Sequence, residues 1–372
     1  MRRRDISKAL LFVSASSTAL VETAQGQTCT PPCYAITAPE SAAGVTVFQT
    51  QYLPGDIRRY YGGESDWTLA LNRLSKVWSE GVACTIPTGT YPYSTSPTWF
   101  VQGNDPMCGT SGHPLCNLTM QLTGERGAVL QHTGTGPAFD IRGPGGAVRS
   151  VVMRISNLII SGNQSTTDGF VTKGVHRSYF HMIEVRNCSG KAFNIQFGIG
   201  NHFDNCFFST NVYASTVLPT QGFCLDNDGN TGNYTTTCTF TRCFVDGLGQ
   251  NGIGCELANA IGNVFIGCTF EANGIGLNIE DGCDGNRFVS AWFESSVTSD
   301  ARIKGRSNHF SNCSFQTLAL SPNVSVSTGR STVFEGGYLQ QVNLQSTSAN
   351  TRFVGIADSF ATITGTGTSQ VF

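Results

Sequence analysis

A short motif recurs along the chain and constrains the fold more than any other feature of the sequence. Each copy follows the pattern N-x-F-x-x-C-x-F or a variant of it, and clear copies begin at Asn201, Asn263, Asn286 and Asn308. The first apolar residues of all copies are Ile155, Phe180, Phe203, Phe240, Phe265, Phe288, Phe310, Phe334 and Phe353, which are separated by steps of 25, 23, 37, 25, 23, 22, 24 and 19 residues. The chain is therefore a repeat protein.

A period near 23 residues with alternating apolar positions is typical of one turn of a β-solenoid, in which glycine- and asparagine-rich corners separate three short strands. A leucine-rich repeat has a similar period, but its Leu/Asn consensus is absent. A second alternating run follows the motif, as in Ile275, Leu277 and Ile279. Because stacked turns lie about 4.8 Å apart, like positions align in columns. The sequence predicts an all-β solenoid with phenylalanine and cysteine columns inside.

Composition excludes several other classes of protein. The chain has 372 residues, including 43 glycines; 40% of the residues are hydrophobic and 13% are charged. Such a chain can bury a large core, so it is not disordered. A formal charge of −2 argues against a nucleic-acid partner, which would require a basic stripe. No stretch of 18 or more apolar residues is present, so we expect no membrane span.

The first 26 residues read as an export signal. Arg2, Arg3 and Arg4 form a basic start, residues 9–21 are mostly apolar, and small residues follow at 24 and 26. The run over residues 3–8 resembles the twin-arginine export signal of bacteria, and an ordinary secretory signal is the alternative. We expect an exported protein, periplasmic or extracellular.

The 14 cysteines divide into two groups. Cys29 with Cys33, and Cys108 with Cys116, lie close in sequence and are plausible disulfides of an exported protein. Those on the repeat are expected to point inward as free thiols, since cysteine is a readily buried small hydrophobe; they are Cys206, Cys243, Cys268 and Cys313. Paired C-x-x-C motifs are absent, so a zinc site is not supported.

A helix is predicted at about residues 66–81, where apolar residues recur at helical spacing behind a candidate N-cap at Ser65 or Asp66. The open end of a solenoid exposes apolar side chains and unpaired strands, so such a helix would cap it. We divide the remaining chain into an N-terminal extension, residues 27–60, and one β-helix domain, residues 61–372.

The start of this domain resembles a known superfamily. The order of the segment Gly-Asp-Ile-Arg-Arg-Tyr at 55–60, the helix, and Pro-Thr-Gly-Thr-Tyr at 87–91 is similar to the pectate-lyase-like superfamily, especially its bacterial polygalacturonase-related members. The resemblance implies a right-handed parallel β-helix that acts on polysaccharides. Because the superfamily contains hydrolases, lyases, epimerases and viral tailspike modules, it leaves the activity open.

One outward column of side chains stands out. The position six residues after the repeat anchors is occupied by Arg186, Ser209, Asp246, Glu271, Glu294, Gln316 and Gln340. Neighbouring carboxylates in such a column would be about 5 Å apart and alternate ones about 9–10 Å apart, which brackets the separations used in glycoside hydrolysis. Like charges at this distance also raise a pKa towards that of a general acid. We name Asp246, Glu271 and Glu294 as candidate catalytic residues; the alternative is that they bond backbone amides at corners.

Three residues are candidates for binding substrate. Trp292 should point outward, where its ring could stack on a sugar. The segment 300–305, Asp-Ala-Arg-Ile-Lys-Gly, is similar to the R-I-K element of polygalacturonases, whose arginine and lysine hold substrate carboxylates. The resemblance implies that Arg302 and Lys304 bind an anionic group, and pairing with Glu280 is the alternative. The N-T-D and G-H-G elements of that family are absent.

The 37-residue step indicates an extra loop over about residues 210–236, which we expect to form one wall of a groove. This loop contains Asp226 and Asp228 in the run Asp-Asn-Asp-Gly-Asn, similar to the start of a calcium loop. An ordinary turn is the alternative reading of the same residues.

Together these features favour an exported polysaccharide-active enzyme, first of all a glycoside hydrolase (depolymerase) that needs no cofactor. A lyase or epimerase acting on uronate-containing glycans, with calcium or Arg/Lys, is the alternative on the same fold. A non-catalytic glycan-binding or tailspike-like surface module, with a homotrimer as its assembly, is the alternative outside enzymes.

Overall fold

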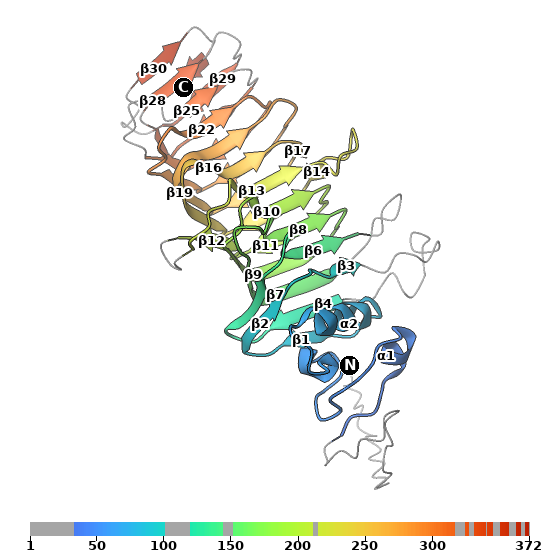
Figure 1. Ribbon diagram of the computed structural model, residues 1–372. Coiled ribbons are helices and arrows are strands. Elements are labelled where there is room, and N and C mark those ends of the chain that lie inside the picture. Colours follow the sequence, from blue (N-terminus) through green and yellow to red (C-terminus); the bar gives the residue numbers. More distant parts are fainter. Residues whose placement is uncertain are drawn as a thin grey trace, which may run out of the picture.

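The computed structural model describes residues 33–100, 120–143, 152–210, 215–316, 324–326, 331–339, 341–344, 350–356, 362–365 and 369–371. These residues form an elongated coil of stacked turns, with the N-terminal helices at one end and the last strands at the other (Figure 1). The predicted export signal and the Cys108–Cys116 pair lie outside the described residues. All strand pairings are parallel, as the repeat predicted.

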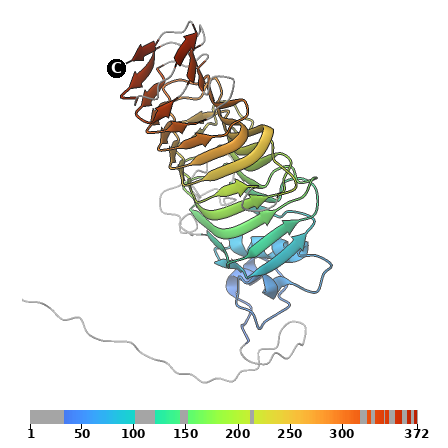
Figure 2. The same ribbon diagram turned by 90° about the vertical axis from the view of Figure 1, so that its left-hand side faces the viewer.

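Each complete turn contributes one strand to each of three faces, and the strands of a face stack one above another (Figure 2). The first face consists of β1 (Cys84–Ile86), β4 (Met120–Gly124), β7 (Met153–Ser161), β9 (Tyr179–Arg186), β11 (His202–Asp204), β15 (Thr239–Thr241), β18 (Val264–Ile266), β20 (Arg287–Val289), β23 (His309–Ser311), β26 (Val333–Glu335), β29 (Thr351–Val354) and β31 (Ser369–Val371).

The second face continues from the first round a corner, and β7 and β9 bend from one to the other. Its other strands are β2 (Gly89–Tyr93), β5 (Ala128–His132), β12 (Phe207–Ser209), β16 (Phe244–Leu257), β19 (Thr269–Ile279), β21 (Trp292–Glu294), β24 (Ser314–Phe315) and β27 (Tyr338–Leu339).

The third face closes the coil, and the later halves of β16 and β19 belong to it. Its other strands are β3 (Thr98–Phe100), β6 (Phe139–Arg142), β8 (Phe170–Lys173), β10 (Lys191–Gln196), β13 (Gln221–Asp226), β22 (Ser299–Ile303), β25 (Val324–Val326), β28 (Gln341–Leu344) and β30 (Thr362–Gly365). A separate pair, β14 (Thr235–Thr236) and β17 (Ala260–Ile261), lies at a corner.

The predicted phenylalanine column runs through the interior. Phe240 and Phe265 stack with ring centroids 4.5 Å apart and planes 7° from parallel, and Phe265 and Phe288 stack at 4.6 Å. The column extends to Phe203 and Phe310 with the same stacked geometry. Each ring is buried by the rings above and below it, so the column forms one continuous apolar core.

The cysteines of the repeat are buried and free, as predicted. Burial raises the pKa of Cys313 to about 12, so this thiol stays protonated and unreactive. Cys33 is disulfide-bonded, and its predicted partner Cys29 lies outside the described residues.

The asparagines that open each repeat lie at the predicted corners and make hydrogen bonds between turns. Asn286 is buried; its Oδ1 accepts from the Asn263 backbone N–H at 3.0 Å, and its Nδ2 donates to the Ala260 carbonyl at 3.0 Å. Asn308 repeats the arrangement one turn later by accepting from the Asn286 backbone N–H. These side chains replace backbone partners that corners would otherwise lack.

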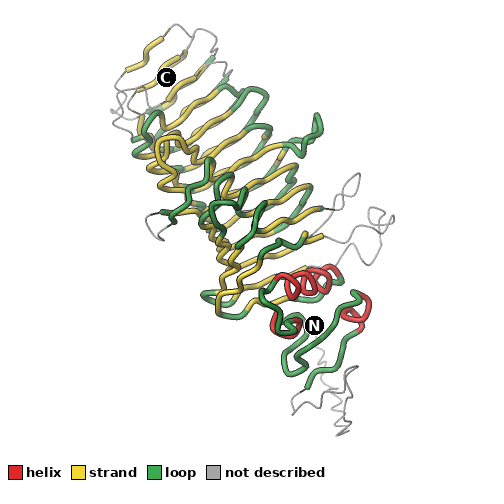
Figure 3. The backbone as a smooth tube through the Cα atoms, viewed as in Figure 1, coloured by secondary structure: helices red, strands yellow, loops and turns green. Residues whose placement is uncertain are grey.

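The predicted capping helix is α2 (Thr68–Ser79), slightly shorter than the predicted 66–81. It lies across the N-terminal end of the coil, where all the helices gather (Figure 3). Its apolar side reaches the interior, and the Trp78 ring meets Trp99 edge-on at 5.5 Å. Asp66 Oδ1 accepts the Thr68 backbone N–H, which satisfies a free donor of the first turn. No helix in the described part of the chain is long and apolar enough to cross a membrane.

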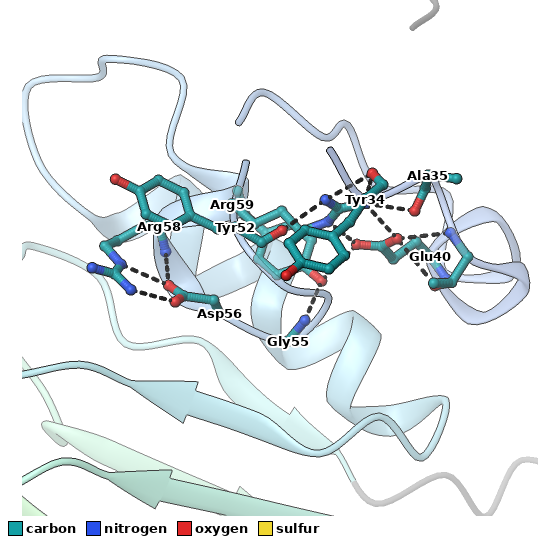
Figure 4. A network of polar contacts seen from close by, with 10 residues as sticks. Tyr34, Ala35, Glu40, Tyr52, Gly55, Asp56, Arg58 and Arg59 are labelled. Carbon is teal, nitrogen blue, oxygen red and sulfur yellow. Dashed lines mark hydrogen bonds and ion pairs between the residues drawn. The ribbon is translucent and has the colours of Figure 1, made fainter. Parts of the chain in front are cut away.

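The segment before this helix is held by a buried ion pair. It contains α1 (Ala38–Ala42) and the short 3-10 helix η1 (Ile57–Tyr60). The Arg59 guanidinium donates to Glu40 at 2.6 Å and to the carbonyl of Ala35 at 2.9 Å, and both charged side chains are fully buried (Figure 4). Burial alone would raise the pKa of Glu40, but hydrogen bonds led by that from Arg59 outweigh it and lower the pKa. The pair therefore stays charged and complete.

The extra residues of the 37-residue step are arranged differently from the expected single loop. Strand β13 lies inside residues 210–236 and pairs with β10 and β16 on the third face. The additional length is divided between the segments on either side of this strand. The difference arises because Phe223 pairs with the inward-facing Phe193 and Cys255 of the neighbouring turns. Residues 221–226 therefore form the third-face strand of their own turn.

Replacing Phe265 by alanine should lower the free energy of unfolding by about 3–5 kcal/mol, since it removes a fully buried ring from the centre of the column. Chemical denaturation of the purified protein measures this. Ile266→Ala is the matched control, because Ile266 lies on the same strand with 41% of its surface exposed and should change stability little. Equal effects of the two substitutions would contradict the interior position of the column.

Candidate functional site

The three candidate carboxylates lie in register on the second face. Strand pairing places Asp246 beside Glu271, and Glu271 beside Glu294. Ser209 precedes them in the same column. The stacking that the repeat predicted therefore brings three acidic residues together on consecutive turns, at the point where this face ends.

The three carboxylates have different surroundings. Asp246 is 1% exposed, and its Oδ1 accepts the backbone N–H of Thr210 at 2.9 Å, which is the corner bond that we considered as the alternative. Glu271 is half-buried, and within the described residues its carboxylate has no hydrogen bond or ion pair. Burial, followed by the charges of Asp246 and Glu294, raises the pKa of Glu271. Glu271 is thus the member suited to carry a proton.

Trp292 lies next to this pair and points outward, as predicted. It is 41% exposed, and its indole N–H donates to Glu294 Oε2 at 2.7 Å. The hydrogen bond holds the indole ring beside the Glu294 carboxylate. An exposed indole with a polar contact at its edge is a surface on which a sugar ring can stack.

Arg302 lies on β22 of the third face, beyond the corner formed by residues 295–298, and Lys304 directly follows this strand. Lys304 Nζ donates to Glu280 at 2.8 Å, which is the ion pair that we considered as the alternative. Arg302 is exposed beside Asn278, and its guanidinium makes no hydrogen bond or ion pair with another described residue. The two basic side chains therefore belong to a different face from the carboxylates.

The acidic residues at the end of β13 and in the loop after it accept hydrogen bonds from asparagines. Asp226 Oδ1 accepts from Asn259 Nδ2 at 2.7 Å, and Asp228 accepts from Asn230 and Asn233. Among the described residues there is no group of three or more His, Cys, Asp or Glu side chains that could hold a metal ion. A calcium ion at Asp226 and Asp228 would need carbonyl or water oxygens, and it stays a prediction.

Sequence reasoning missed a polar cluster on the first face. His181 Nδ1 lies 3.0 Å from Asp204 Oδ2, and the Tyr179 hydroxyl donates to the same oxygen at 3.2 Å. The sequence did contain a signal for this contact. His181 directly follows Phe180 and Asp204 directly follows Phe203, so both occupy the same position in consecutive turns.

Comparison with known proteins supports the fold alone. The sequence matches no family model, and no curated protein is similar to it. The A-module of mannuronan C-5 epimerase AlgE4 from Azotobacter vinelandii is similar in structure, with a TM-score of 0.50 and 13% identity over 85% of this chain and 97% of that one.

Two further solved structures are similar with lower scores. The AlgE6 A-module of the same organism gives a TM-score of 0.48 and 14% identity, covering 85% of this chain and 99% of that one. The enzymatically active domain of tailspike protein 2 from bacteriophage CBA120 gives 0.47 and 11%, covering 86% of this chain and 44% of that one. The parallel strand pairing and the likeness to the AlgE4 A-module show that the chain is a right-handed parallel β-helix protein.

Glu271→Gln should stabilise the protein at neutral pH by about 0.2–1 kcal/mol, the usual effect of a like-charge pair on adjacent strands. Because the pKa of Glu271 is raised in the folded state, its ionised form destabilises the fold. The difference from the parent should vanish below the unfolded-state pKa, near about pH 4. Thermal unfolding at pH 4 and pH 8 measures it.

The control substitution is Glu280→Gln, which should have the opposite sign. The hydrogen bond from Lys304 lowers the pKa of Glu280, so its charge stabilises the fold at neutral pH. If Glu271→Gln instead destabilises the protein at pH 8, Glu271 serves as a structural acceptor rather than as a proton carrier.

Proposed function

We propose that this protein is a polysaccharide-active enzyme that hydrolyses a glycosidic bond of a substrate bound between the carboxyl groups of Glu271 and Glu294. The observation that carries the proposal is the unequal pair itself. Glu271 has no partner among the described residues and has a raised pKa, whereas Glu294 accepts a hydrogen bond from Trp292. A glycosidase needs one protonated and one ionised carboxyl group at neutral pH.

In the first step, the Glu271 carboxyl gives its proton to the glycosidic oxygen while the Glu294 carboxylate attacks the anomeric carbon. The carbon–oxygen bond to the leaving sugar breaks, and a glycosyl ester forms on Glu294. In the second step, water attacks the same carbon, the ionised Glu271 takes its proton, and Glu294 is released. Each group returns to its starting state, so the cycle needs no cofactor.

The spacing of the turns favours retention of configuration. Residues paired on adjacent parallel strands are separated by about 4.8 Å, close to the 5–5.5 Å that a retaining pair requires and too short to admit a water for inversion. Asp246 and Glu294 are two turns apart, but Asp246 is 1% exposed and holds the Thr210 amide. We therefore assign Asp246 the role of keeping the pKa of Glu271 raised.

A polysaccharide suits this position. The exposed Trp292 ring adjoins the pair, and a glycan lying along the coil axis would meet successive turns at regular intervals. The similar AlgE4 A-module belongs to a protein whose name states an action on mannuronan, which is consistent with a glycan substrate.

The second candidate function is a lyase or epimerase acting on a uronate-containing glycan. The observation that favours it is the exposed Arg302, whose guanidinium has no partner among the described residues and could hold a carboxylate. Calcium at Asp226 and Asp228 would serve the same purpose. A glycan-binding module without activity is the remaining class.

The deciding experiment incubates the purified protein with a panel of neutral and acidic polysaccharides, with and without EDTA. New reducing ends without an unsaturated product support hydrolysis. If an unsaturated uronate forms and its formation stops in EDTA, the reaction is an elimination at the Asp226 loop and the proposal of hydrolysis is rejected. Binding without any product would leave a binding module.

Glu271→Gln and Glu294→Ala should each reduce the rate of hydrolysis at least about 100-fold, as expected for loss of an acid or a nucleophile. Added azide should restore turnover of Glu294→Ala, because it replaces the missing nucleophile, and should leave Glu271→Gln unimproved. Glu335→Gln, an exposed carboxylate on the first face, is the control. A parent-like rate for either variant of the pair rejects the mechanism.

Asp246→Asn should shift the alkaline limb of the pH–rate profile to lower pH. The alkaline limb reports the loss of the proton from Glu271, and removing the neighbouring negative charge lowers the pKa of that group. Asparagine retains an oxygen for the Thr210 N–H, so the corner should persist. An unchanged alkaline limb would mean that another group supplies the proton.

A further inference from the structure

A cleft of about 570 Å³ lies on the first face, over β4, β7 and β9, three turns nearer the N-terminus than Glu271. These strands are in the lower part of the coil in Figure 1. Its polar lining includes Arg154 on β7, Arg177 in the corner before β9, and Tyr179 and His181 on β9. The cleft is on a different face from the carboxylate column, so it is a separate site.

His181 is held in one orientation and one tautomer. Asp204 accepts from His181 Nδ1 and from the Tyr179 hydroxyl through one oxygen, and from Arg242 Nη2 at 2.9 Å through the other. Burial opposes the charge of Asp204, but hydrogen bonding from Arg242 outweighs it and lowers the pKa. Because an ionised carboxylate only accepts, Nδ1 carries the hydrogen, and the Nε2 of neutral His181 is a free acceptor.

The two arginines of the cleft have unmatched charges. Arg154 and Arg177 are exposed, and neither guanidinium forms a hydrogen bond or ion pair with another described residue. The nearby negative charge of Asp204 is already paired with Arg242. The cleft therefore has an excess of positive charge, carried by groups whose planar donors suit a carboxylate or a sulfate.

The backbone at Arg177 is strained. Its φ is 52°, in the left-handed region, where the next turn has Gly200 with φ 64°. A non-glycine residue in this conformation costs about 1 kcal/mol. The Arg177 stem lies over Gly200, where a Cβ would be 3.8 Å from Arg177 Cγ.

We propose that this cleft is a second carbohydrate site, which binds an acidic sugar unit through Arg154 and Arg177 while His181 Nε2 accepts a hydrogen bond from a sugar hydroxyl. The Tyr179 ring, half-buried and fixed at its hydroxyl, lies beside the sugar. A carboxylate and a sulfate ester share the recognised chemistry. The site would make the protein selective for acidic polysaccharides, and it does not depend on hydrolysis at Glu271.

The test measures binding by titration calorimetry to the full-length chain carrying Glu271→Gln, so that hydrolysis cannot consume the ligand. The probes are tetragalacturonate, a sulfated galactan tetrasaccharide and neutral galactotetraose. Binding of either acidic probe, weakened by added salt, with no binding of the neutral probe, is the expected result. The tighter of the two acidic probes identifies the anionic group.

Adding Arg154→Gln and Arg177→Gln should reduce the affinity for the acidic probe at least tenfold, and His181→Asn should reduce it without removing the charge preference. Arg287→Gln is the control, since Arg287 is an exposed arginine of the same face, on β20 outside the cleft. Because both cleft arginines are exposed, the melting temperature should not change.

Equal binding of the neutral probe, no binding of any probe, or parent-like affinity of the double arginine variant would overturn the proposal. The imidazole signal of His181 in NMR spectra, identified by its loss in His181→Asn, should shift when the acidic probe binds, and an unmoved signal would also overturn it. Hydrolysis at Glu271 is measured in separate variants, so failure of one proposal is distinguishable from failure of the other.

Discussion

The in-register stacking of parallel turns is the interaction on which the rest of this structure depends. Backbone hydrogen bonds fix the separation of the turns at about 4.8 Å, and every side chain then lies beside the same position of the next turn. Inside, this forces aromatic rings into one stacked column, with Phe240 and Phe265 at 4.5 Å. At the corners, it lets Asn263, Asn286 and Asn308 satisfy one another's backbone. In-register stacking thus produces both the apolar core and the hydrogen bonds that satisfy the backbone at the corners.

The same stacking determines which outward-facing charged side chains lie next to one another. Stacking places Glu271 between two other carboxylates, and burial together with their repulsion raises its pKa. Protonation of one group or binding of a cationic partner would relieve this repulsion. On the first face, stacking instead brings His181 beside Asp204, where the contact is favourable. The same stacking can therefore place like charges together on one face of a β-helix and favourable partners together on another.

Much of this was readable from the sequence. The motif period predicted the coil, the direction of the phenylalanine and cysteine columns, and the alignment of the three carboxylates. It offered a corner hydrogen bond as the alternative for all three carboxylates but did not reveal that the buried Asp246 is the one that holds the Thr210 amide, because burial at a corner depends on how the adjacent segment packs. Nor did it separate Arg302 from the carboxylates, because that depends on which side of a corner each column falls. The cluster of Tyr179, His181 and Asp204 was readable in principle, since its members share repeat positions.

By itself, the sequence determined the architecture, because a repeated alternation of apolar residues has one way to bury them all: stacked turns around a common interior. It also determined which residues become neighbours within a column, since register follows from the period. Only the tertiary structure decided which outward groups are exposed, paired or left alone, as with Lys304 bound to Glu280 and Arg154 without a partner among the described residues. Those outcomes depend on the path of the corners and on contacts across faces, where no period relates one residue to another.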